Sequence, residues 1–423
     1  MKYKSGEDFI DKLYQNLHLS SSVVKSGNKN DSREKKIANY LERLEQIHAK
    51  ALESEHKKEL LCEFYYDKYI IKELPENYIA FLKRQNIERG EQNKEIDEEK
   101  LLKKVREDQK ASLDLWLDYF FKNDANYPSW FKFYAFNGML KLNSLNKEKE
   151  NFGKRSKNTT EFYVELSPEA LAQVYTTLND EINGKELTDE EVQALEKGES
   201  FAKLYTFYLE RQGVFRKDSE TEGKWVKYQW QKDYYDLWKS LQGKYTNWCT
   251  AGKATAKDHL KTGDFYVYYT KDQNGQYENP RIAIRMDGET EIIEVRGVGP
   301  DQNLESNMID IAENKLKEFK DYPRFKQKIE DMKYLTVLWQ KQQKCEEFTK
   351  EDIAFLYEID HTVRSFGYQK DPRLEEIKEK RDKEKDLLYY FDCKKENIGT
   401  TVEDVEKGNI IIYDGNLSTK KIV

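Results

Sequence analysis

Aromatic side chains are the main material from which this chain can build a core. Its 423 residues include 29 Tyr and 20 Phe, while charged residues make up 36% of the sequence. A chain so rich in charge stays disordered when it has little apolar area to bury. Because each aromatic ring buries a large area, this composition predicts folded domains instead. Domains usually run to about 100–200 residues, so the length predicts two or three of them.

The charge and the cysteines narrow the class of protein. The net charge is −7 with Lys and Glu both abundant, which argues against a general nucleic-acid coat protein but leaves room for a local basic site. A zinc site needs about four closely spaced Cys or His ligands. No such spacing occurs, so we predict no metal site and no cofactor. Single scattered cysteines are typical of the reducing cytosol. They are Cys62, Cys249, Cys345 and Cys393.

The hydropathy pattern places the chain in the cytoplasm. No apolar run approaches the roughly 18 residues that a membrane-spanning helix requires. The first fifteen residues, MKYKSGEDFIDKLYQ, lack the apolar stretch of a secretory signal. We therefore expect a cytoplasmic protein without a membrane partner.

Helical patterns cover most of the sequence. Apolar residues between Arg33 and Lys83 recur at three- and four-residue spacing, as on one face of a helix. Ser167 followed by Pro168 predicts a helix start, with Ser as the cap and Pro in the first turn. Thr188 with Glu191 forms a capping-box pattern for the next helix.

Strands are predicted in one part of the chain. Residues 264–270, 281–286 and 291–296 read as three strands, and Asp287-Gly288 makes a good turn between the last two. The predicted fold class is therefore α+β, predominantly helical with one small antiparallel sheet at about 264–296. A further strand and turn are expected at 409–417. The four expected regions are an N-terminal helical region (1–110), a helical region with an aromatic and basic segment (111–222), an α+β module (223–322) and a C-terminal helical region ending in a strand (323–423).

The segment around Cys249 is the most chemically suggestive part of the sequence. Small residues after it predict a helix that begins near Thr250 and stops at Gly263. Cys249 would then lie at a helix N-terminus, where free amides and the helix dipole favour a thiolate. The alternative is a buried structural cysteine beside Trp248, because Cys is among the most buried residue types.

A reactive cysteine also needs a base within reach. His259 is the nearest in sequence, but ten residues along one helix separate the two by about 15 Å. They approach each other only if the helix breaks, and Gly252 is the natural place. His361 is distant in sequence and would have to be brought close by the fold.

The predicted strands carry further polar candidates. Alternation puts Ile282 and Ile284 toward the core and predicts that Arg281 and Arg285 point outward together. With Arg296 they would form an exposed cluster able to bind phosphate or carboxylate; the alternative is a merely solvated face. The candidate ligand-binding residues are Trp248, Thr250, Tyr266, Arg281, Arg285, Glu294 and Arg296.

Residues 127–160 combine aromatic and basic side chains. Aromatic stacking in a cationic groove is how single-stranded nucleic acid is held, which makes Lys154, Arg155 and Lys157 candidate RNA contacts. The alternative is an amphipathic core helix followed by a lysine-rich loop, because aromatics at helical spacing usually build core.

Two resemblances accompany these patterns. The order W-C-T-A at 248–251, G-D-F-Y-V-Y-Y from Gly263, P-R-I-A-I-R from Pro280 and E-V-R-G from Glu294 resembles the C-terminal module of PcfJ-like proteins. It covers about 240–305, roughly a fifth of the chain. It implies a Cys-containing helix start followed by a Gly-led strand and a further strand. The module's Gln-led ending is replaced here by E-V-R-G, with Gln302-Asn303 following later.

The second resemblance is to a family of long bacterial hypothetical proteins of unassigned function. It rests on the segments 127–136, 153–157, 166–172, 355–360 and 366–373. In some members the region after 410–417 continues into leucine-rich strand repeats, so the resemblance is to the front part of that architecture. Neither resemblance implies a reaction.

Two function classes follow from these patterns. The first is an intracellular binding protein for a protein or RNA partner, with a pocket at the Cys249 helix start. The second is a cysteine-dependent hydrolase or transferase that uses Cys249, with His259 or His361 as its base.

Overall fold

The computed structural model describes residues 2–15, 17–88, 95–121, 126–146, 149–214, 220–272, 274–367, 369–399, 410 and 412–413. These residues divide into two compact units, Met1–Pro280 and Arg281–Val423. Helices account for 57% of the structure, which confirms the predicted helix-dominated α+β class. The four predicted regions are finer than these two units and stay a prediction. None of the described helices is long and apolar enough to cross a membrane.

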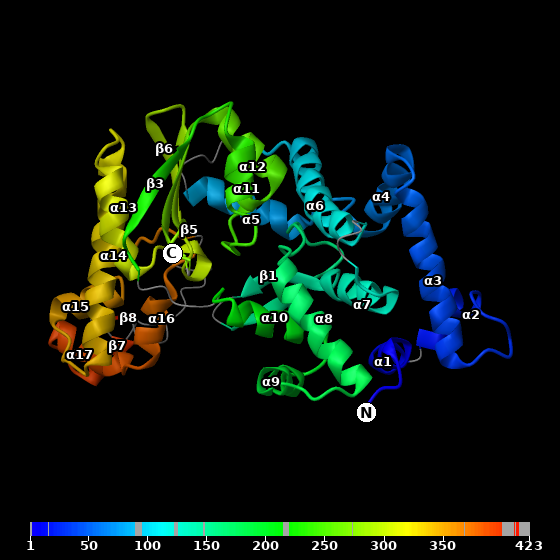
Figure 1. Ribbon diagram of the computed structural model, residues 1–423. Coiled ribbons are helices and arrows are strands. Elements are labelled where there is room, and N and C mark those ends of the chain that lie inside the picture. The colour runs from blue at the N-terminus through cyan, green and yellow to red at the C-terminus, as the bar shows by residue number, and fades with distance from the viewer. Residues whose placement is uncertain are drawn as a thin grey trace, which may run out of the picture. The chain divides into compact units, whose positions relative to one another are not determined.

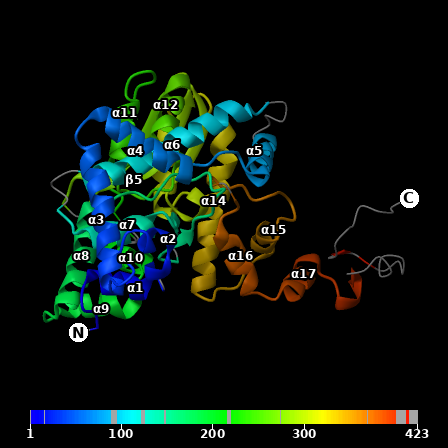
Figure 2. The same ribbon diagram turned by 90° about the vertical axis from the view of Figure 1, so that its right-hand side faces the viewer.

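The first unit is a helical assembly with short strands (Figure 1). Within it, α10 packs against α7, α8 and α9, and α12 packs against α6 and α11. Figure 2 brings the hairpin of α3 and α4 toward the viewer. The helices are α1 (Gly6–Leu13), α2 (Ser21–Val24), α3 (Arg33–Ala51), α4 (Glu55–Tyr69), α5 (Glu76–Glu88), α6 (Glu98–Phe121), α7 (Ser129–Met139), α8 (Pro168–Asn183), α9 (Asp189–Lys197), α10 (Phe201–Arg211), α11 (Tyr234–Ser240) and α12 (Lys253–Thr262), with short 3-10 turns η1 (Leu17–Leu19) and η2 (Cys249–Ala251).

Local side-chain caps set several helix starts, as the sequence predicts. The Ser167 hydroxyl accepts a hydrogen bond from the Ala170 amide at 3.2 Å, and α8 begins at the next residue, Pro168. Thr188 and Glu191 form the predicted capping box at the start of α9. Each cap satisfies amide groups that the first helical turn leaves without a partner.

Aromatic rings form the core of the first unit. Trp116 on α6 and Tyr134 on α7 are fully buried, and both meet Phe201 of α10 edge-on at 6.2 and 5.7 Å between ring centres. Tyr205 stacks on Phe201 at 5.0 Å. The Trp116 indole donates a hydrogen bond to the Val164 carbonyl at 2.8 Å, which satisfies its buried polar group. The composition argument for an aromatic core is confirmed.

Two strand pairs lie in the first unit. Of their four strands, only the one expected at 264–270 was predicted from the sequence. β1 (Leu142–Asn146) and β2 (Asn151–Lys154) form an antiparallel hairpin where a loop was expected. That expectation was wrong because Leu142 and Leu145 are buried, which outweighs the polar composition around them. β3 (Gly223–Tyr228) pairs antiparallel with the predicted strand β4 (Phe265–Lys271).

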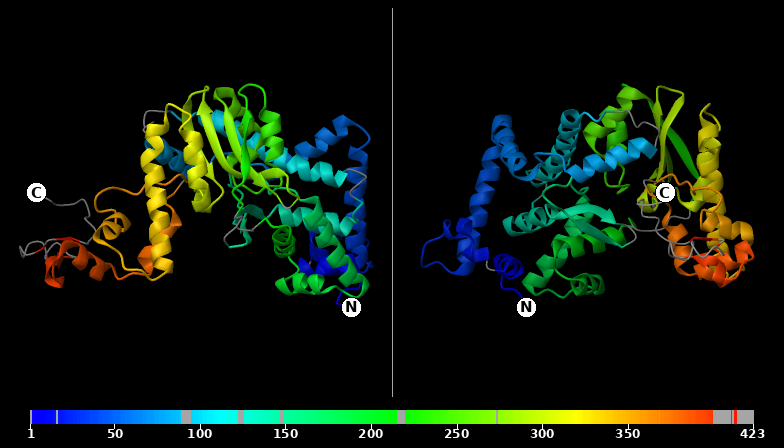
Figure 3. Two further views of the ribbon diagram at one scale, coloured as in Figure 1. Left: turned by 60° about the vertical axis from the view of Figure 1, so that its left-hand side comes forward. Right: turned by 180° about the vertical axis from the view of Figure 1, so that it is seen from behind.

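The second unit is built around α14 (Figure 3). β5 (Tyr277–Asp287), which begins at the end of the first unit, pairs antiparallel with β6 (Glu291–Gly297), as predicted. The helices are α13 (Ile309–Leu316), α14 (Tyr322–Gln343), α15 (Lys350–Leu356), α16 (Pro372–Glu379) and α17 (Lys383–Phe391), with 3-10 turns η3 (Pro300–Gln302), η4 (Ser306–Met308) and η5 (Lys395–Asn397). β7 (Ile398–Gly399) pairs with β8 (Ile412–Tyr413), the strand expected near the end of the sequence. The turn expected after it lies outside the described residues.

The close approach of α7 and α10 at Gly138 gives a stability prediction. A Cβ atom added there would lie 2.3 Å from the Phe201 side chain. Replacing Gly by Ala in an open helix adds about 0.5–1 kcal/mol of stability, whereas overpacking a core costs about 1–3 kcal/mol. We therefore expect Gly138→Ala to lower the free energy of unfolding in urea. Gly153→Ala is the control, since its nearest neighbour would be an ordinary 3.4 Å away. A more stable Gly138→Ala protein would contradict this packing.

Candidate functional site

Cys249 lies before the helix, not at its first turn. It begins the short η2 segment, the chain is extended at Gly252, and α12 starts at Lys253. The predicted start near Thr250 was therefore three residues too early, although Gly263 does follow the last residue of α12. Cys249 is exposed, so the buried structural alternative was wrong. Its neighbour Trp248 fills the buried position instead, at 2% exposure.

The N-terminus of α12 is held by a carboxylate from another helix. Asp108 of α6 accepts hydrogen bonds from the amides of Ala254 at 2.7 Å and Thr255 at 3.2 Å, and from the Thr255 hydroxyl. Burial raises the pKa of Asp108, while these hydrogen bonds favour its charged form. Gly252 permits the close approach, because a Cβ there would lie 2.5 Å from the Asp108 carboxyl carbon. Asp108 thus supplies the anion that this helix start attracts.

His259 meets the η2 segment through the break at Gly252. It is buried in α12, and its Nδ1 atom lies 3.3 Å from the Thr250 hydroxyl. Its ring stacks on Phe265 with 6.1 Å between ring centres. The predicted condition for a local approach, a break at Gly252, is confirmed. His259 thus contacts Thr250, the residue next to Cys249.

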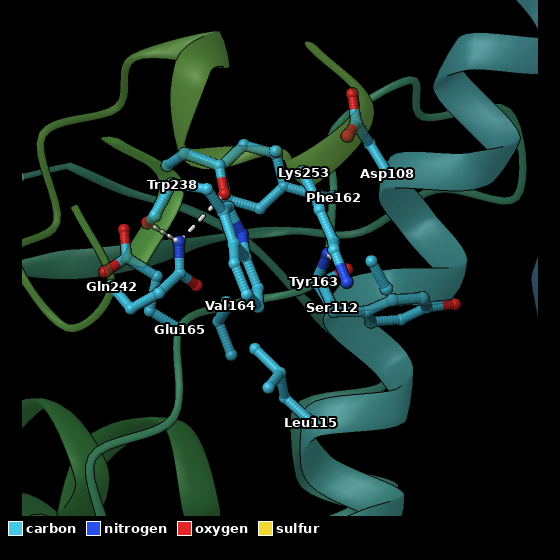
Figure 4. Close-up of a pocket in the computed structure, with 13 residues that line it drawn as sticks. Asp108, Ser112, Leu115, Phe162, Tyr163, Val164, Glu165, Trp238, Gln242 and Lys253 are labelled. Atoms are coloured by element: carbon cyan, nitrogen blue, oxygen red, sulfur yellow. Dashed lines mark hydrogen bonds between the residues drawn. The ribbon is translucent and has the colours of Figure 1, made fainter. Parts of the chain in front are cut away.

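A shallow hollow lies beside the same segment. Figure 4 shows Asp108, Ser112 and Leu115 along α6, with Trp238 and Gln242 across from them. Gln242 donates hydrogen bonds to the carbonyls of Trp238 at 2.9 Å and Ala251 at 3.0 Å. The space inside it that water could occupy is about 10 Å³, room for about one water molecule and far below the roughly 300–1,000 Å³ of small-molecule sites. The hollow is therefore too small to enclose a small-molecule substrate.

Lysines of α12 lie over aromatic rings of α11 at the edge of this hollow. The Lys253 ammonium is 5.0 Å from the Trp238 ring centre and 5.8 Å from that of Tyr235. The Lys257 ammonium is 5.6 Å from the ring of Tyr234. Tyr235 is 49% exposed, and Lys257 is exposed as well. We call these five residues the aromatic–lysine face.

Sequence reasoning missed this face, although a signal was present. Eight lysines and three aspartates lie between residues 223 and 262, in a chain whose net charge is −7. On α11, Tyr234 and Trp238 are four residues apart, as are Lys253 and Lys257 on α12. That spacing puts each pair on one side of its helix.

The predicted exposed arginine cluster was wrong. Arg281 and Arg296 are buried in the second unit, at 2% and 8% exposure, and Arg285 is half-buried. Arg281 donates to the Glu305 carboxylate at 2.7 Å, while Arg296 pairs with Glu294 and donates to the Phe366 carbonyl at 2.9 Å. Ile282 and Ile284 face the core, as predicted. The opposite side of the strand, where the arginines lie, is covered by the segments that carry Glu305 and Phe366. These arginines therefore have internal partners; their predicted ligand contacts stay a prediction.

The remaining candidates lie in different parts of the fold. In the first unit, Tyr266 is buried on β4 directly opposite Lys227, whose ammonium is 5.9 Å from its ring. In the second unit, Nε2 of His361 lies 3.1 Å from the Asp331 carboxylate, and the side chain of Asp331 is buried. Asp331 also accepts hydrogen bonds from the Gln327 side chain and the Arg364 amide.

The aromatic and basic segment divides between core and surface. The aromatic residues of α7 build core, as the alternative interpretation predicted. Lys154 and Lys157 are exposed. Arg155 donates to the carbonyls of Glu161 at 2.7 Å and Phe162 at 3.0 Å, and burial lowers its pKa. Contact of Lys154, Arg155 and Lys157 with RNA stays a prediction, with Arg155 already engaged inside the protein.

Comparison with known proteins does not assign a family. No protein-family model, curated protein or solved structure matches this chain. Among the described residues, no group of three or more His, Cys, Asp or Glu side chains is placed to hold a metal ion.

The contact between Asp108 and α12 gives a stability prediction. Asp108→Ala leaves the half-buried Ala254 amide and the buried amide and hydroxyl of Thr255 without their acceptor, and each buried group without a partner costs about 1–3 kcal/mol. We expect urea unfolding of the variant to show a loss of at least about 1 kcal/mol. Asp258→Ala, which removes a surface pair with Lys261, should change stability by less than about 1 kcal/mol. Equal effects from the two substitutions would contradict the role of Asp108.

Cysteine reactivity gives a second prediction. Cys249 and Cys345 are both exposed, and Asp108 rather than a thiolate occupies the α12 helix start. We expect iodoacetamide to modify these two cysteines at similar rates at about pH 6, where an ordinary thiol is almost wholly protonated. Buried Cys62, whose pKa burial raises to about 11, should react only on unfolding. Peptide mass spectrometry measures each rate, and a Cys249 that reacts far faster than Cys345 would support the enzyme alternative.

Proposed function

We propose that this chain is an intracellular binding protein whose aromatic–lysine face holds single-stranded nucleic acid. The observation that carries the proposal is the position of the Lys253 ammonium, 5.0 Å from the Trp238 ring centre at the edge of the hollow. An ammonium beside a partly exposed indole offers one group for a phosphate and another for a base. Aromatic stacking combined with a cationic surface is the usual way of holding single strands.

The charge distribution supports an anionic partner. The segment 223–262 is locally basic, while the chain as a whole is acidic. An ammonium over an exposed ring gains only about 0.5–1 kcal/mol, so Lys253 and Lys257 can turn toward a phosphate at little cost. Counterion release on phosphate binding would then favour association at low salt.

The small size of the hollow supports a ligand that lies along the surface. With room for about one water molecule, the hollow cannot enclose a ligand, so a partner would contact the exposed rings and ammonium groups instead. Tyr235 lies one turn before Trp238 on α11, so a second base has its own ring to stack on. An acidic protein segment is the runner-up partner, since it matches the lysines but uses the exposed rings less.

A cysteine-dependent hydrolase or transferase is the second candidate function, and the exposure of Cys249 favours it. The amides at the start of α12 already bind Asp108, which weakens the argument for a stabilised thiolate. We also propose that residues 240–305 form a PcfJ-like module, which would place η2 and α12 at its start.

Binding to a short, fluorescently labelled single-stranded RNA tests the proposal. We expect Trp238→Ala to weaken binding by about fivefold or more, because stacking contributes about 1–3 kcal/mol per base. Lys253→Glu/Lys257→Glu should weaken binding further and flatten its salt dependence. Fluorescence anisotropy at several salt concentrations measures both effects.

The matched control is another lysine that lies over a tryptophan. The Lys380 ammonium is 5.4 Å from the Trp339 ring centre in the second unit, so Lys380→Glu should leave the affinity unchanged. Tight binding of polyglutamate in place of RNA would favour the acidic-protein partner. RNA binding that persists in Lys253→Glu/Lys257→Glu would overturn the assignment of this face.

A further inference from the structure

Helix α4 turns apolar side chains toward solvent. Leu60 and Phe64 are 53% and 60% exposed, and they lie four residues apart on one side of the helix. Lys57 precedes Leu60 by three residues, and Asp67 follows Phe64 by three. This alternation of three and four residues is the spacing of a seam along which two helices pack. We call these four residues the α4 stripe.

The opposite side of α4 fixes the direction in which the stripe faces. Cys62 is buried, the Tyr66 hydroxyl donates to Asp114 at 2.5 Å, and the Lys58 ammonium lies 2.5 Å from Asp118. Both aspartates belong to α6. Because α6 covers this side, the α4 stripe points away from the body of the first unit. Leu60 and Phe64 therefore remain open to solvent.

The stripe is complementary to itself when reversed. A two-fold axis at the level of Cys62 exchanges Leu60 with Phe64 and Lys57 with Asp67. Two antiparallel copies of α4 would therefore place apolar against apolar at the centre and lysine against aspartate at both ends. A parallel arrangement would place like charges together instead. Symmetric interfaces in which one patch meets its own copy are the commonest kind in protein oligomers.

We propose that α4 mediates antiparallel self-association of this chain, with a second copy as the occupant of the α4 stripe. The contacts that Lys57 and Asp67 now make do not oppose this. Lys57 pairs with Glu53 and Asp67 with Lys72, and the side chains of Lys57 and Asp67 are 49% and 82% exposed. Exposed pairs contribute about 0–1 kcal/mol, so both side chains can exchange partners readily. This inference is independent of the nucleic-acid face.

Sedimentation velocity of the full chain over a wide concentration range tests the proposal. We expect a reversible dimer, and Phe64→Asp should weaken self-association at least about tenfold, a change of about 1.4 kcal/mol. Val192→Asp is the matched control, because Val192 on α9 is also 42% exposed but lies outside the stripe. Circular dichroism of each variant confirms that it is folded.

Charge reversal tests the antiparallel register directly. Lys57→Asp alone and Asp67→Lys alone should each weaken the dimer, because like charges then meet at both ends of the seam. Mixing these two variants, or combining both substitutions in one chain, restores opposite charges and should restore association. A chain that stays monomeric at every concentration, or a dimer indifferent to Phe64→Asp, would overturn the proposal and leave the stripe for a different protein. A dimer that charge reversal affects without rescue would overturn the antiparallel register.

Discussion

The hydrogen bonds of Asp108 are the interaction on which the candidate site depends. This carboxylate reaches from α6 to the first amides of α12, and Gly252 leaves the space for it. Burying a carboxylate is costly unless it is hydrogen-bonded. The hydrogen bonds of Asp108 therefore hold α12 against α6. The position of α12 in turn fixes Lys253 against Trp238 and bounds the hollow on one side. The buried Asp108 carboxylate therefore positions the lysines of the aromatic–lysine face.

The same interaction changes the interpretation of Cys249. A helix start that already binds a carboxylate offers less to a thiolate, and the break at Gly252 sets Cys249 before the helix. What the break does provide is the approach of Thr250 to His259, which ties η2 back onto α12. The segment is thus built as a fixed edge beside the hollow, which fits binding more directly than nucleophilic catalysis.

Sequence patterns predicted features that depend on near neighbours and missed those that depend on distant ones. Ser167, Thr188 and the strands at 264–296 were predicted because caps and alternation act within a few residues. The burial of Arg281 depends on Glu305, and the capping of α12 depends on Asp108, 146 residues before Ala254. No local pattern carries such pairings. The hairpin of β1 and β2 was missed because only tertiary packing reveals that Leu142 and Leu145 are buried.

Hydrogen–deuterium exchange of the full chain with and without single-stranded RNA is the most direct measurement of the central claim. If the aromatic–lysine face holds RNA, the amides of α11 and of the segment from η2 into α12 should exchange more slowly when RNA is present, with smaller changes in α9 and α17. Protection confined to other elements, or an exchange pattern that RNA leaves unchanged, would contradict the account.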